Sequence, residues 1–243
     1  MKKAEKELEI ILNDKIHGSS EILSLIFDNL LKYKNDTEYL NKALYKSKKY
    51  FPHFPVIIYF NKEIENILEG RGKDSLTDYI IKSRTKQDET YGRLFKKAFK
   101  VLSKHKTVLT ISHSKTLIKI FELWKKTYRD LKVIVCESRP NYEGILMVDE
   151  ISKLKIKTKV ISEATTGKLI KEVDAVILGA DQFLLNGNII NKTGSRMLAV
   201  LAKYQKIPVY VLATSDKIVI KKNIINENFE EIEKGLITKI FTD

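Results

Sequence analysis

The fold class of this chain is decided by residues 108–136, VLTISHSKTLIKIFELWKKTYRDLKVIVC. Two short runs rich in β-branched residues, Val108–Ile111 and Val133–Cys136, flank one amphipathic segment at about residues 115–129. A strand, a helix and a strand at this spacing form a crossover unit, in which the two strands are parallel members of one sheet. The stretch therefore predicts an α/β fold.

The same alternation continues toward the C-terminus. Three further apolar runs have the composition of buried strands, Val160–Ile161, Ala175–Leu178 and Val209–Leu212. Helices are expected between the runs at about residues 115–129, 143–153, 165–172 and 192–205. Strands that alternate with helices in this way build a parallel sheet that is covered on both faces. We therefore predict a Rossmann-like parallel sheet domain at residues 106–243.

Residues 1–105 have few strand-like runs and a clear helical periodicity. Four amphipathic helices are expected there, at about residues 21–31, 37–50, 56–69 and 75–103. Ser20 is the expected N-cap of the first helix, and Asp36 or Thr37 starts the second. Gly70-Arg71-Gly72 is expected to separate the last two. This part predicts a helical N-terminal domain at residues 1–105.

The composition narrows the class of protein further. A single cysteine among 243 residues excludes a disulfide framework and a multi-cysteine metal site, and indicates a reducing compartment. The four histidines are too scattered to suggest a metal site, and no motif calls for a cofactor. No stretch reaches the roughly 18 apolar residues of a membrane span, and charges interrupt the N-terminal segment. We therefore expect a cytoplasmic protein without a membrane partner.

The net charge of +13 has two interpretations. The excess is spread along the chain, and 38 of the 44 basic residues are lysine, whereas specific readers of bases and phosphates favour arginine. A solvated lysine-rich surface is the first interpretation. An electrostatic footprint for RNA or an acidic partner is the second.

Short polar segments follow the predicted strands. In an open parallel sheet the ligand lies beyond the carboxyl ends of the strands, so these segments are the candidate site. They are Ser112–Ser114, Glu137–Pro140, Ser162–Ala164, Gly179–Asp181 and Ala213–Ser215.

Each of these segments has a functional and a structural interpretation. Asp181 either acts as an acid, base or hydroxyl ligand, or caps the next turn. Ser112 and Ser114, with the intervening histidine, either line an oxyanion or phosphate pocket or cap a helix. Arg139 either clamps a phosphate or pairs with Glu137 across its loop.

A second segment with two interpretations is NGNIINKTG at residues 186–194. Asn186-Gly187 suits a tight turn. Asn191-Lys192 would then open a helix whose free N–H groups favour an anion. The alternative is an N-capped helix with a solvated lysine. Cys136, in an apolar run, is expected to be a buried small hydrophobe.

Four motifs in this order and spacing resemble those of one family: CESRP at residues 136–140, GAD at 179–181, NGNIINKTG at 186–194 and IPVYVLA at 207–213. The family holds the alpha, beta and delta subunits of translation initiation factor 2B, together with ribose-1,5-bisphosphate isomerase and methylthioribose-1-phosphate isomerase. The resemblance covers about residues 107–243. It implies a helical N-terminal domain, a Rossmann-like C-terminal domain, and a homodimer or higher oligomer formed through the latter.

The resemblance also implies roles for individual residues. Asp181 matches the catalytic aspartate of the isomerases. Asn191 and Lys192 match the pair that holds the sugar phosphate, and Lys217 and Arg139 match further positions of the ligand site. Gly18 and Ser19 match an N-terminal phosphate clamp.

Two features depart from the family pattern. Ser112 stands where the isomerases have their catalytic cysteine, and a serine hydroxyl does not ionise as a thiol does. Two phosphate-binding arginines are also replaced, within His17-Gly18-Ser19 and Phe51-Pro52-His53. Each lost charge-assisted bond is worth roughly 1.5–3 kcal/mol.

The sequence therefore predicts a non-catalytic regulatory or assembly subunit related to initiation factor 2B. It would bind a phosphorylated small molecule, either a sugar phosphate or a nucleotide, and a translation factor is a possible partner. One alternative is an aldose–ketose isomerase acting on a phosphorylated ribose, with Asp181 as acid or base and Ser112 or a water in place of the thiol. The second alternative is a lysine-rich RNA-associated protein.

Overall fold

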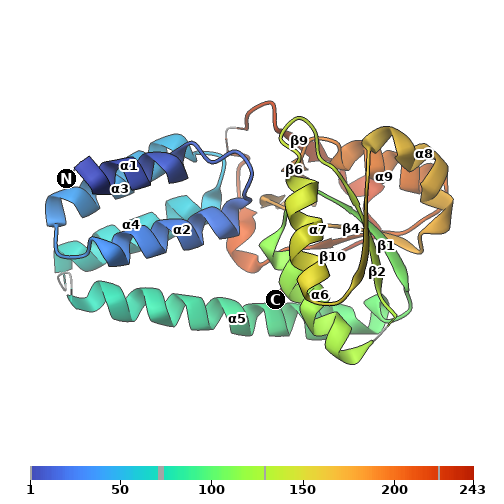
Figure 1. The fold of residues 1–243 in the computed structure, drawn as a ribbon, viewed down its shortest axis with the longest axis horizontal. Coiled ribbons are helices and arrows are strands. Elements are labelled where there is room, and N and C mark those ends of the chain that lie inside the picture. The colour runs from blue at the N-terminus through green and yellow to red at the C-terminus, as the bar shows by residue number, and fades with distance from the viewer. Residues whose placement is uncertain (1, 71–73, 129, 224) are drawn as a thin grey trace.

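The chain folds into a bundle of helices followed by an α/β part, as Figure 1 shows. The computed structural model describes residues 2–70, 74–128, 130–223 and 225–243. Within these residues no helix is both long and apolar enough to cross a bilayer. The two parts together form the fold that the sequence predicts.

The bundle consists of four helices and the first half of a fifth. They are α1 (Lys2–Leu12), α2 (Ser19–Lys32), α3 (Thr37–Tyr50), α4 (Pro55–Gly70) and α5 (Asp74–Leu102). Their apolar faces meet in one buried cluster that includes Leu23, Leu44 and Ile57. The helices predicted for this part are confirmed, although the expected separator Gly70-Arg71-Gly72 reaches into residues that lie outside the described ones.

One of the two expected helix caps is confirmed and the other is wrong. Asp36 caps α3, because its carboxylate accepts a hydrogen bond from the backbone N–H of Tyr39 at 2.9 Å. Ser20 is not the N-cap of α2; the helix begins one residue earlier and its cap is Gly18, which has no side chain to offer. The first N–H groups of α2 are therefore left without a side-chain acceptor from the cap.

Helix α5 joins the two parts of the molecule. It has 29 residues and runs from the bundle along to the sheet (Figure 1). Leu76 and Ile80 near its start belong to the core of the bundle. Leu94 and Leu102 nearer its end belong to the core beneath the sheet.

The α/β part is built on a six-stranded sheet in which every pairing is parallel. Its strands are β1 (Thr107–Ile111), β2 (Lys132–Cys136), β3 (Lys157–Ile161), β4 (Ala175–Leu178), β7 (Val209–Leu212) and β10 (Lys239–Phe241). They lie in the order β10-β7-β4-β1-β2-β3. The five predicted strands are thus confirmed, and β10 is a sixth strand at one edge of the sheet.

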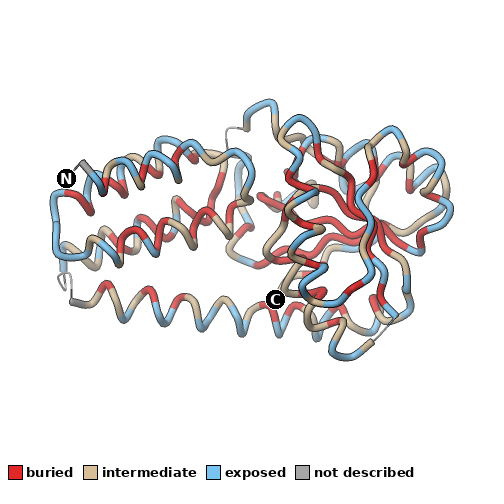
Figure 2. The backbone as a smooth tube through the Cα atoms, viewed as in Figure 1, coloured by how far each residue is buried: buried red, intermediate tan, exposed pale blue. Residues whose placement is uncertain are grey.

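Both faces of this sheet are buried by helices. Alternate residues of a strand point to opposite faces. Val133 and Val135 of β2 accordingly pack with α5, α6 (Lys115–Thr127) and α7 (Glu143–Lys153), whereas Ile134 and Cys136 pack on the side of α9 (Ser195–Tyr204). A chain of short helical turns at residues 163–172, which includes α8 (Thr166–Leu169), also covers the second face. In Figure 2 the sheet strands are accordingly the most continuous buried segments.

A second, four-stranded sheet was not predicted. It is formed by β5 (Gln182–Leu184), β6 (Ile189–Lys192), β8 (Ile218–Val219) and β9 (Phe229–Ile232), in the order β8-β5-β6-β9. The tight turn expected at Asn186-Gly187 joins β5 to β6, with Gly187 at a φ of +89°. The helix expected to open at Asn191-Lys192 is corrected, because these two residues end β6 and α9 starts at Ser195.

Candidate functional site

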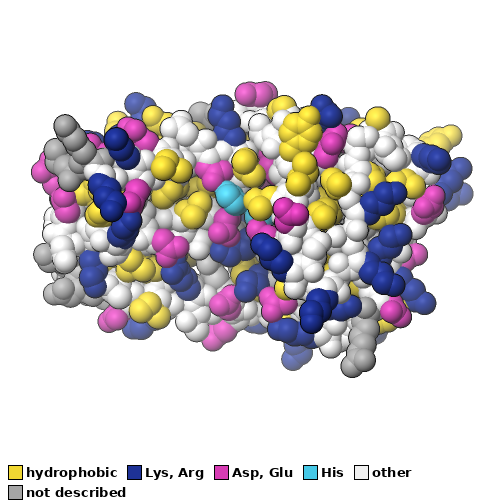
Figure 3. Space-filling view, viewed as in Figure 1, with side chains coloured by type: hydrophobic (Ala, Val, Ile, Leu, Met, Phe, Trp, Pro, Cys, Tyr) yellow, Lys and Arg dark blue, Asp and Glu magenta, His cyan; other side chains and the backbone are white. Residues whose placement is uncertain are grey.

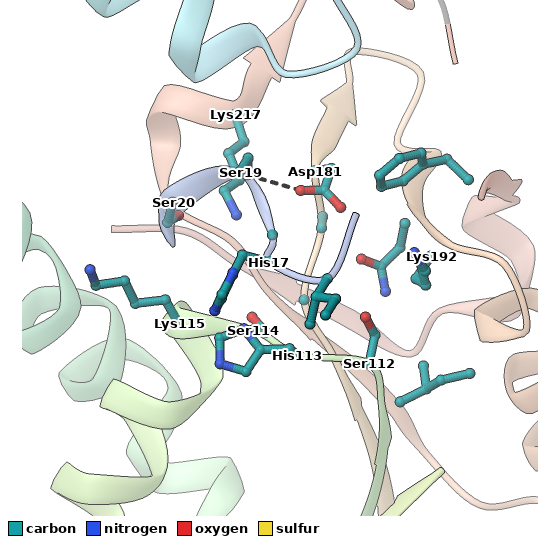
Figure 4. Close-up of a pocket in the computed structure, with 17 residues that line it drawn as sticks. His17, Ser19, Ser20, Ser112, His113, Ser114, Lys115, Asp181, Lys192 and Lys217 are labelled. Atoms are coloured by element: carbon teal, nitrogen blue, oxygen red, sulfur yellow. Dashed lines mark hydrogen bonds between the residues drawn. The ribbon is translucent and has the colours of Figure 1, made fainter. Parts of the chain in front are cut away.

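A pocket lies where the order of the large sheet changes direction. From β1 the chain proceeds through β2 and β3 toward one edge, and from β4 it proceeds through β7 and β10 toward the other. Loops that follow adjacent strands with opposite routes diverge, and the crevice between them is the usual ligand site of such sheets. The loops after β1 and β4 line the pocket, together with residues 16–20 at the start of α2 (Figure 4).

Eight of the nine site residues expected from the sequence line this one pocket. They are Gly18, Ser19, Ser112, Ser114, Asp181, Asn191, Lys192 and Lys217. They come from the bundle, from the loops after β1, β4 and β7, and from the end of β6. The fold thus brings together residues that are separated by up to two hundred positions in the chain.

Arg139 lies apart from the pocket. Its guanidinium donates to the carboxylate of Glu137 at 2.7 Å and lies 4.9 Å from the ring centroid of Tyr142. Its side chain is 64% exposed. Of the two interpretations made from the sequence, the geometry favours pairing across the loop.

Asp181 links the bundle to the sheet. Its carboxylate accepts a hydrogen bond from the Ser19 hydroxyl at 2.8 Å, drawn as a dashed line in Figure 4. Both residues are buried. Ser19, the first residue of α2, thus ties the bundle to the loop after β4.

Ser112 occupies a conformation that is uncommon for a residue with a side chain. Its φ is +67°, in the left-handed region, where a Cβ meets the backbone unfavourably. Such conformations cost of order 1–3 kcal/mol and cluster at functional sites. Here the conformation places Ser112 on the pocket lining at the carboxyl end of β1.

Ser114 takes the structural role that the sequence allowed for it. It is the N-cap of α6, and its hydroxyl accepts from the backbone N–H of Leu117 at 3.3 Å. The neighbouring Lys115 pairs with Glu21 at 2.8 Å. The positive charge of Lys115 is therefore already balanced at the pocket rim.

Lys192 forms a buried ion pair with Glu143, the first residue of α7. The side chain of Lys192 is 8% exposed and that of Glu143 is fully buried. The Lys192 ammonium also lies 5.5 Å from the ring centroid of Phe229. The lysine expected to supply a free charge for phosphate is thus neutralised by a carboxylate.

A close contact fixes Glu143 in place. A Cβ on its neighbour Gly144 would lie 1.9 Å from the carbonyl oxygen of Cys136. Only glycine therefore lets α7 begin so near the end of β2. This approach carries the Glu143 carboxylate to Lys192.

Lys217 is a buried lysine of the pocket whose positive charge is not paired within the described residues. It is 4% exposed, and within the described residues its ammonium has neither an ion-pair partner nor a hydrogen bond. In Figure 4 its side chain extends toward the interior of the pocket. Burial of an unpaired ammonium costs free energy, because the charge loses its hydration. A buried lysine without a partner is therefore a candidate binding group for an anion.

The N-terminus of α9 is already bound by a carboxylate of the chain. The carboxylate of Glu230 on β9 accepts from the backbone N–H groups of Gly194 and Arg196, at 2.7 and 2.8 Å. Asn191 turns its amide to the hydroxyl of Ser195 at 2.9 Å. The anion site expected at this helix is corrected, because a carboxylate of the chain fills it.

The N-terminus of α2 remains open to the pocket. Its cap residue Gly18 makes no side-chain hydrogen bond, and Ser19 and Ser20 line the pocket. α2 has 14 residues, long enough to carry a macrodipole that favours negative charge at this end. The backbone N–H groups at this end of α2 and the Lys217 ammonium are therefore two sets of hydrogen-bond donors at the same pocket.

Two of the four histidines, His17 and His113, line this pocket, and a third, His53, lies near Asp181. A hydrogen bond to the Asp14 carboxylate raises the pKa of His17 above its usual value. Burial lowers the pKa of His113, against the attraction of Glu150. Burial likewise lowers the pKa of His53, against the attraction of Asp181. The charged imidazolium is therefore favoured at His17 alone of these three.

Cys136 does not line the pocket. Burial raises the pKa of the Cys136 thiol to about 12, so the thiol is inert at neutral pH, as the apolar run around it suggested. Among the described residues no cluster of three or more histidine, cysteine, aspartate and glutamate side chains is arranged to hold a metal.

The pocket is narrow. Its free volume of about 40 Å³ holds a few water molecules at most, whereas small-molecule pockets usually have 300–1,000 Å³. Residues 16–20 form one wall and are held by the Ser19–Asp181 bond. The free volume in this conformation is therefore smaller than a sugar phosphate.

A larger groove of about 680 Å³ lies between α4, α5 and the loop after β7. Aromatic residues such as Tyr59 and Tyr79 line it, with lysines at positions 82 and 86. Its charged side chains are exposed or half-buried. The smaller pocket differs because buried charged residues line it, namely Asp181, Lys192 and Lys217.

The excess of positive charge is scattered over the surface that Figure 3 shows. Lys and Arg side chains there are interspersed with Asp and Glu, without one continuous basic face. This distribution fits the interpretation of a solvated lysine-rich surface.

Some residues of the site were not singled out from the sequence. Glu143 and Glu230 neutralise Lys192 and the α9 N-terminus, yet each stands in a segment with an ordinary helical or strand-like pattern. Asp14 was also missed, although an Asp three residues before a His, just ahead of a helix, is a signal that could have been used. Carboxylates that come from distant elements leave no such signal.

Comparisons with known proteins identify the family of the chain. The model of the "Initiation factor 2 subunit family" matches residues 32–239. A Pyrococcus furiosus protein described as eIF-2B subunit 2-like is 30% identical over 129 residues, which are 53% of this chain and 46% of that protein. The ribose 1,5-bisphosphate isomerase of Methanocaldococcus jannaschii is 25% identical over 240 residues, covering 93% of this chain and 77% of that enzyme.

A solved structure supports the fold across nearly the whole chain. The translation initiation factor eIF-2B of Pyrococcus horikoshii superposes with a TM-score of 0.83, covering 99% of this chain and 94% of that one at 21% identity. The chain spans about half of the length of the curated Pyrococcus relatives it matches.

Proposed function

Because this chain belongs to the initiation factor 2 subunit family, we propose that it is a non-catalytic regulatory or assembly subunit that binds a phosphorylated small molecule. The ligand is a sugar phosphate or a nucleotide. The observation that carries the proposal is Lys217, a buried ammonium without a partner in the described residues, in a pocket that also receives the open N-terminus of α2.

The residues around the pocket argue against rapid chemistry. Ser112 offers a hydroxyl in place of a thiol, and no described side chain lies within hydrogen-bond distance of that hydroxyl to act as a base. Asp181 is engaged with Ser19. The pocket therefore supports binding of an anion better than turnover of a sugar.

A thermal-shift panel of sugar phosphates and nucleotides tests the proposal. A ligand present at 100 times its dissociation constant adds about 2.7 kcal/mol of stability, which raises the Tm of a chain of this size by several degrees. We expect such a shift for at least one phosphorylated compound and none for its unphosphorylated counterpart. Equal shifts from both members of a pair, or none from any, would contradict a phosphate site.

An isomerase is the second candidate, supported by one observation. Asp181 and Ser112 line the same pocket at the ends of adjacent strands, and Ser112 has the strained backbone typical of active sites. In this mechanism Asp181 moves the proton between adjacent carbons. If the wild type isomerises ribose 1,5-bisphosphate, we expect Asp181→Asn to abolish the activity; unchanged turnover in that variant would exclude this mechanism.

We also propose that the chain self-associates through α9, and that a translation factor is a further partner. Met197, Val200 and Tyr204 are 42%, 43% and 81% exposed and lie on one face of the helix. Exposed apolar stripes of this kind mark protein interfaces. We expect light scattering to give a dimer or larger mass for the wild type and a smaller mass for Val200→Glu; a monomeric wild type would exclude this interface.

A further inference from the structure

His17 is fixed at the edge of the pocket by its own loop. Its Nδ1 lies 2.6 Å from Oδ2 of Asp14. The other oxygen of Asp14 accepts from the backbone N–H groups of Ile16 and His17, at 2.8 and 2.9 Å. Three hydrogen bonds to one carboxylate thus set both the loop and the orientation of the imidazole.

The second nitrogen of His17 is left free. Nδ1 is the donor to Asp14, and Nε2 makes no hydrogen bond with any described residue. A neutral imidazole with its proton on Nδ1 presents a lone pair at Nε2, whereas the imidazolium presents an N–H. Only the charged form donates to a phosphate oxygen.

The groups that face His17 favour this charged form. Asp14 holds the pKa of His17 above its usual value, and Glu21 and Glu150 act in the same direction. Burial of Asp14 opposes its ionisation, but the hydrogen bonds from His17 and Ile16 outweigh burial and bring the pKa of Asp14 to about 2. The Asp14–His17 pair therefore carries its proton on the histidine.

A second imidazole stands against the first. The rings of His17 and His113 meet edge to face, with centroids 5.4 Å apart. His113 is buried, its Nε2 lies 3.0 Å from Glu150, and its Nδ1 has no partner among the described residues. Burial keeps its pKa low, and a charge there would repel the charge on His17. Lys115 is nearby but is paired with Glu21.

We propose that His17 is an anion-binding residue of this pocket whose affinity for phosphate is linked to its proton. The imidazolium, oriented by Asp14, donates Nε2–H to a ligand phosphate oxygen. The residue stands on the segment that forms one wall of the pocket, so a bound phosphate also contacts this segment. The inference rests on the proposed function and names the regulation of the same site.

The sign of the linkage is fixed by the raised pKa. Below the pKa of His17 the donor is already formed, and affinity for the anion is at its maximum. As the pH rises through that pKa, which lies above 6.5, binding must take up a proton, and affinity falls by up to about tenfold per pH unit. By reciprocity, a bound anion raises the pKa of His17.

Proton–carbon NMR of the histidine Cε1 groups tests the inference directly, with inorganic sulfate as the probe. The chain has four histidines, so each signal can be assigned by one substitution. Sulfate remains a dianion between about pH 6 and 9, so the probe itself does not titrate beside the histidines. We expect sulfate to raise the pKa of His17 and to leave that of His105, which lies after α5 and outside the pocket, unchanged.

Two variants complete the test. His17→Gln keeps an N–H donor at every pH, so we expect its sulfate affinity to become nearly independent of pH over the range in which His17 titrates. Asp14→Asn removes the carboxylate, so we expect the fall in affinity to occur at a lower pH. His105→Gln is the matched control and should retain the wild-type profile.

The outcomes separate this inference from the proposed function. Sulfate that binds wild type and His17→Gln with the same pH profile, and leaves the His17 pKa unmoved, overturns the role of His17 but leaves a phosphate site intact. Failure of sulfate and phosphate to bind wild type overturns the role of His17, and failure of every phosphorylated compound in the thermal-shift panel overturns the proposed function as well. The wild-type NMR titration distinguishes these outcomes even if a variant fails to fold.

Discussion

Replacing Lys192 by methionine is expected to lower the free energy of unfolding by about 3–5 kcal/mol. The change removes the only ion-pair partner of Glu143 in the described structure, and the Glu143 side chain is fully buried. One of its carboxylate oxygens already has no hydrogen-bond partner, and the other keeps only the amide of Asn141 at 3.3 Å. A carboxylate left in this state must stay charged without a partner or become protonated, and both cost stability.

Urea unfolding of three variants measures this effect. Glu143→Gln should also destabilise, because it leaves Lys192 without its carboxylate. The double variant Lys192→Met with Glu143→Gln should recover much of the loss, because no buried charge then remains.

The matched control for this series is Lys222→Met. Lys222 pairs with Glu231 at 2.9 Å, but its side chain is 45% exposed, so the loss should not exceed about 1 kcal/mol. A loss for Lys192→Met as small as that of the control, or a double variant as unstable as the sum of both singles, would contradict the buried pair.

Lys217→Met is expected to weaken ligand binding without lowering the stability of the unliganded protein, unlike Lys192→Met. We expect the affinity for a phosphorylated ligand to fall by about 10- to 100-fold, since a charge-assisted hydrogen bond contributes roughly 1.5–3 kcal/mol. The stability of the unliganded protein should stay the same or rise, because the substitution removes a buried ammonium that has no partner in the described residues. The two lysines of the pocket are thus distinguished by experiment.

Calorimetric titration with the strongest ligand of the thermal-shift panel measures the loss of affinity, and urea unfolding of the free protein measures the stability. Lys171→Met is the control, because this lysine is exposed and lies outside the pocket. Wild-type affinity in Lys217→Met would show that Lys217 does not bind the ligand. A strong loss of stability without ligand would show that Lys217 has a structural partner.

Five of the six strands of the large sheet could be predicted from the sequence because each of the five is a local signal. Ala175–Leu178 is apolar at every position since β4 is buried on both faces, and such runs stand out from the amphipathic helices between them. The small sheet could not be predicted in the same way. β8 has two residues, and β5 and β6 are a short hairpin whose pairing with β9 depends on contacts forty residues away.

The sequence places most of the candidate residues where the structure has one pocket, but it does not show which of their charges are paired. Asp181 and Ser112 follow strands whose carboxyl ends meet at one edge, and this rule places them together. The rule does not say which charged side chains of the site form ion pairs. Lys192 and Lys217 look equally available in the sequence, but Glu143 reaches Lys192 only because Gly144 lets α7 pack against Cys136.

The N-terminus of α9 shows the same limit. The glycine and serine around it are typical of an anion-binding turn, and the turn does bind a carboxylate. That carboxylate belongs to Glu230, which β9 supplies from thirty-six residues along the chain. Tertiary contacts of this kind decide which of several plausible charges remains free, and no local pattern records them.

Phosphorus NMR of ribose 1,5-bisphosphate with the wild-type protein tests the central claim, binding of a phosphorylated ligand without turnover, in a single measurement. The account predicts that both phosphorus resonances broaden and shift in proportion to the protein added, that Lys217→Met removes this effect, and that no new signal grows with time. New phosphorus signals that accumulate at a rate proportional to protein concentration would contradict it, as the chain would then be an isomerase.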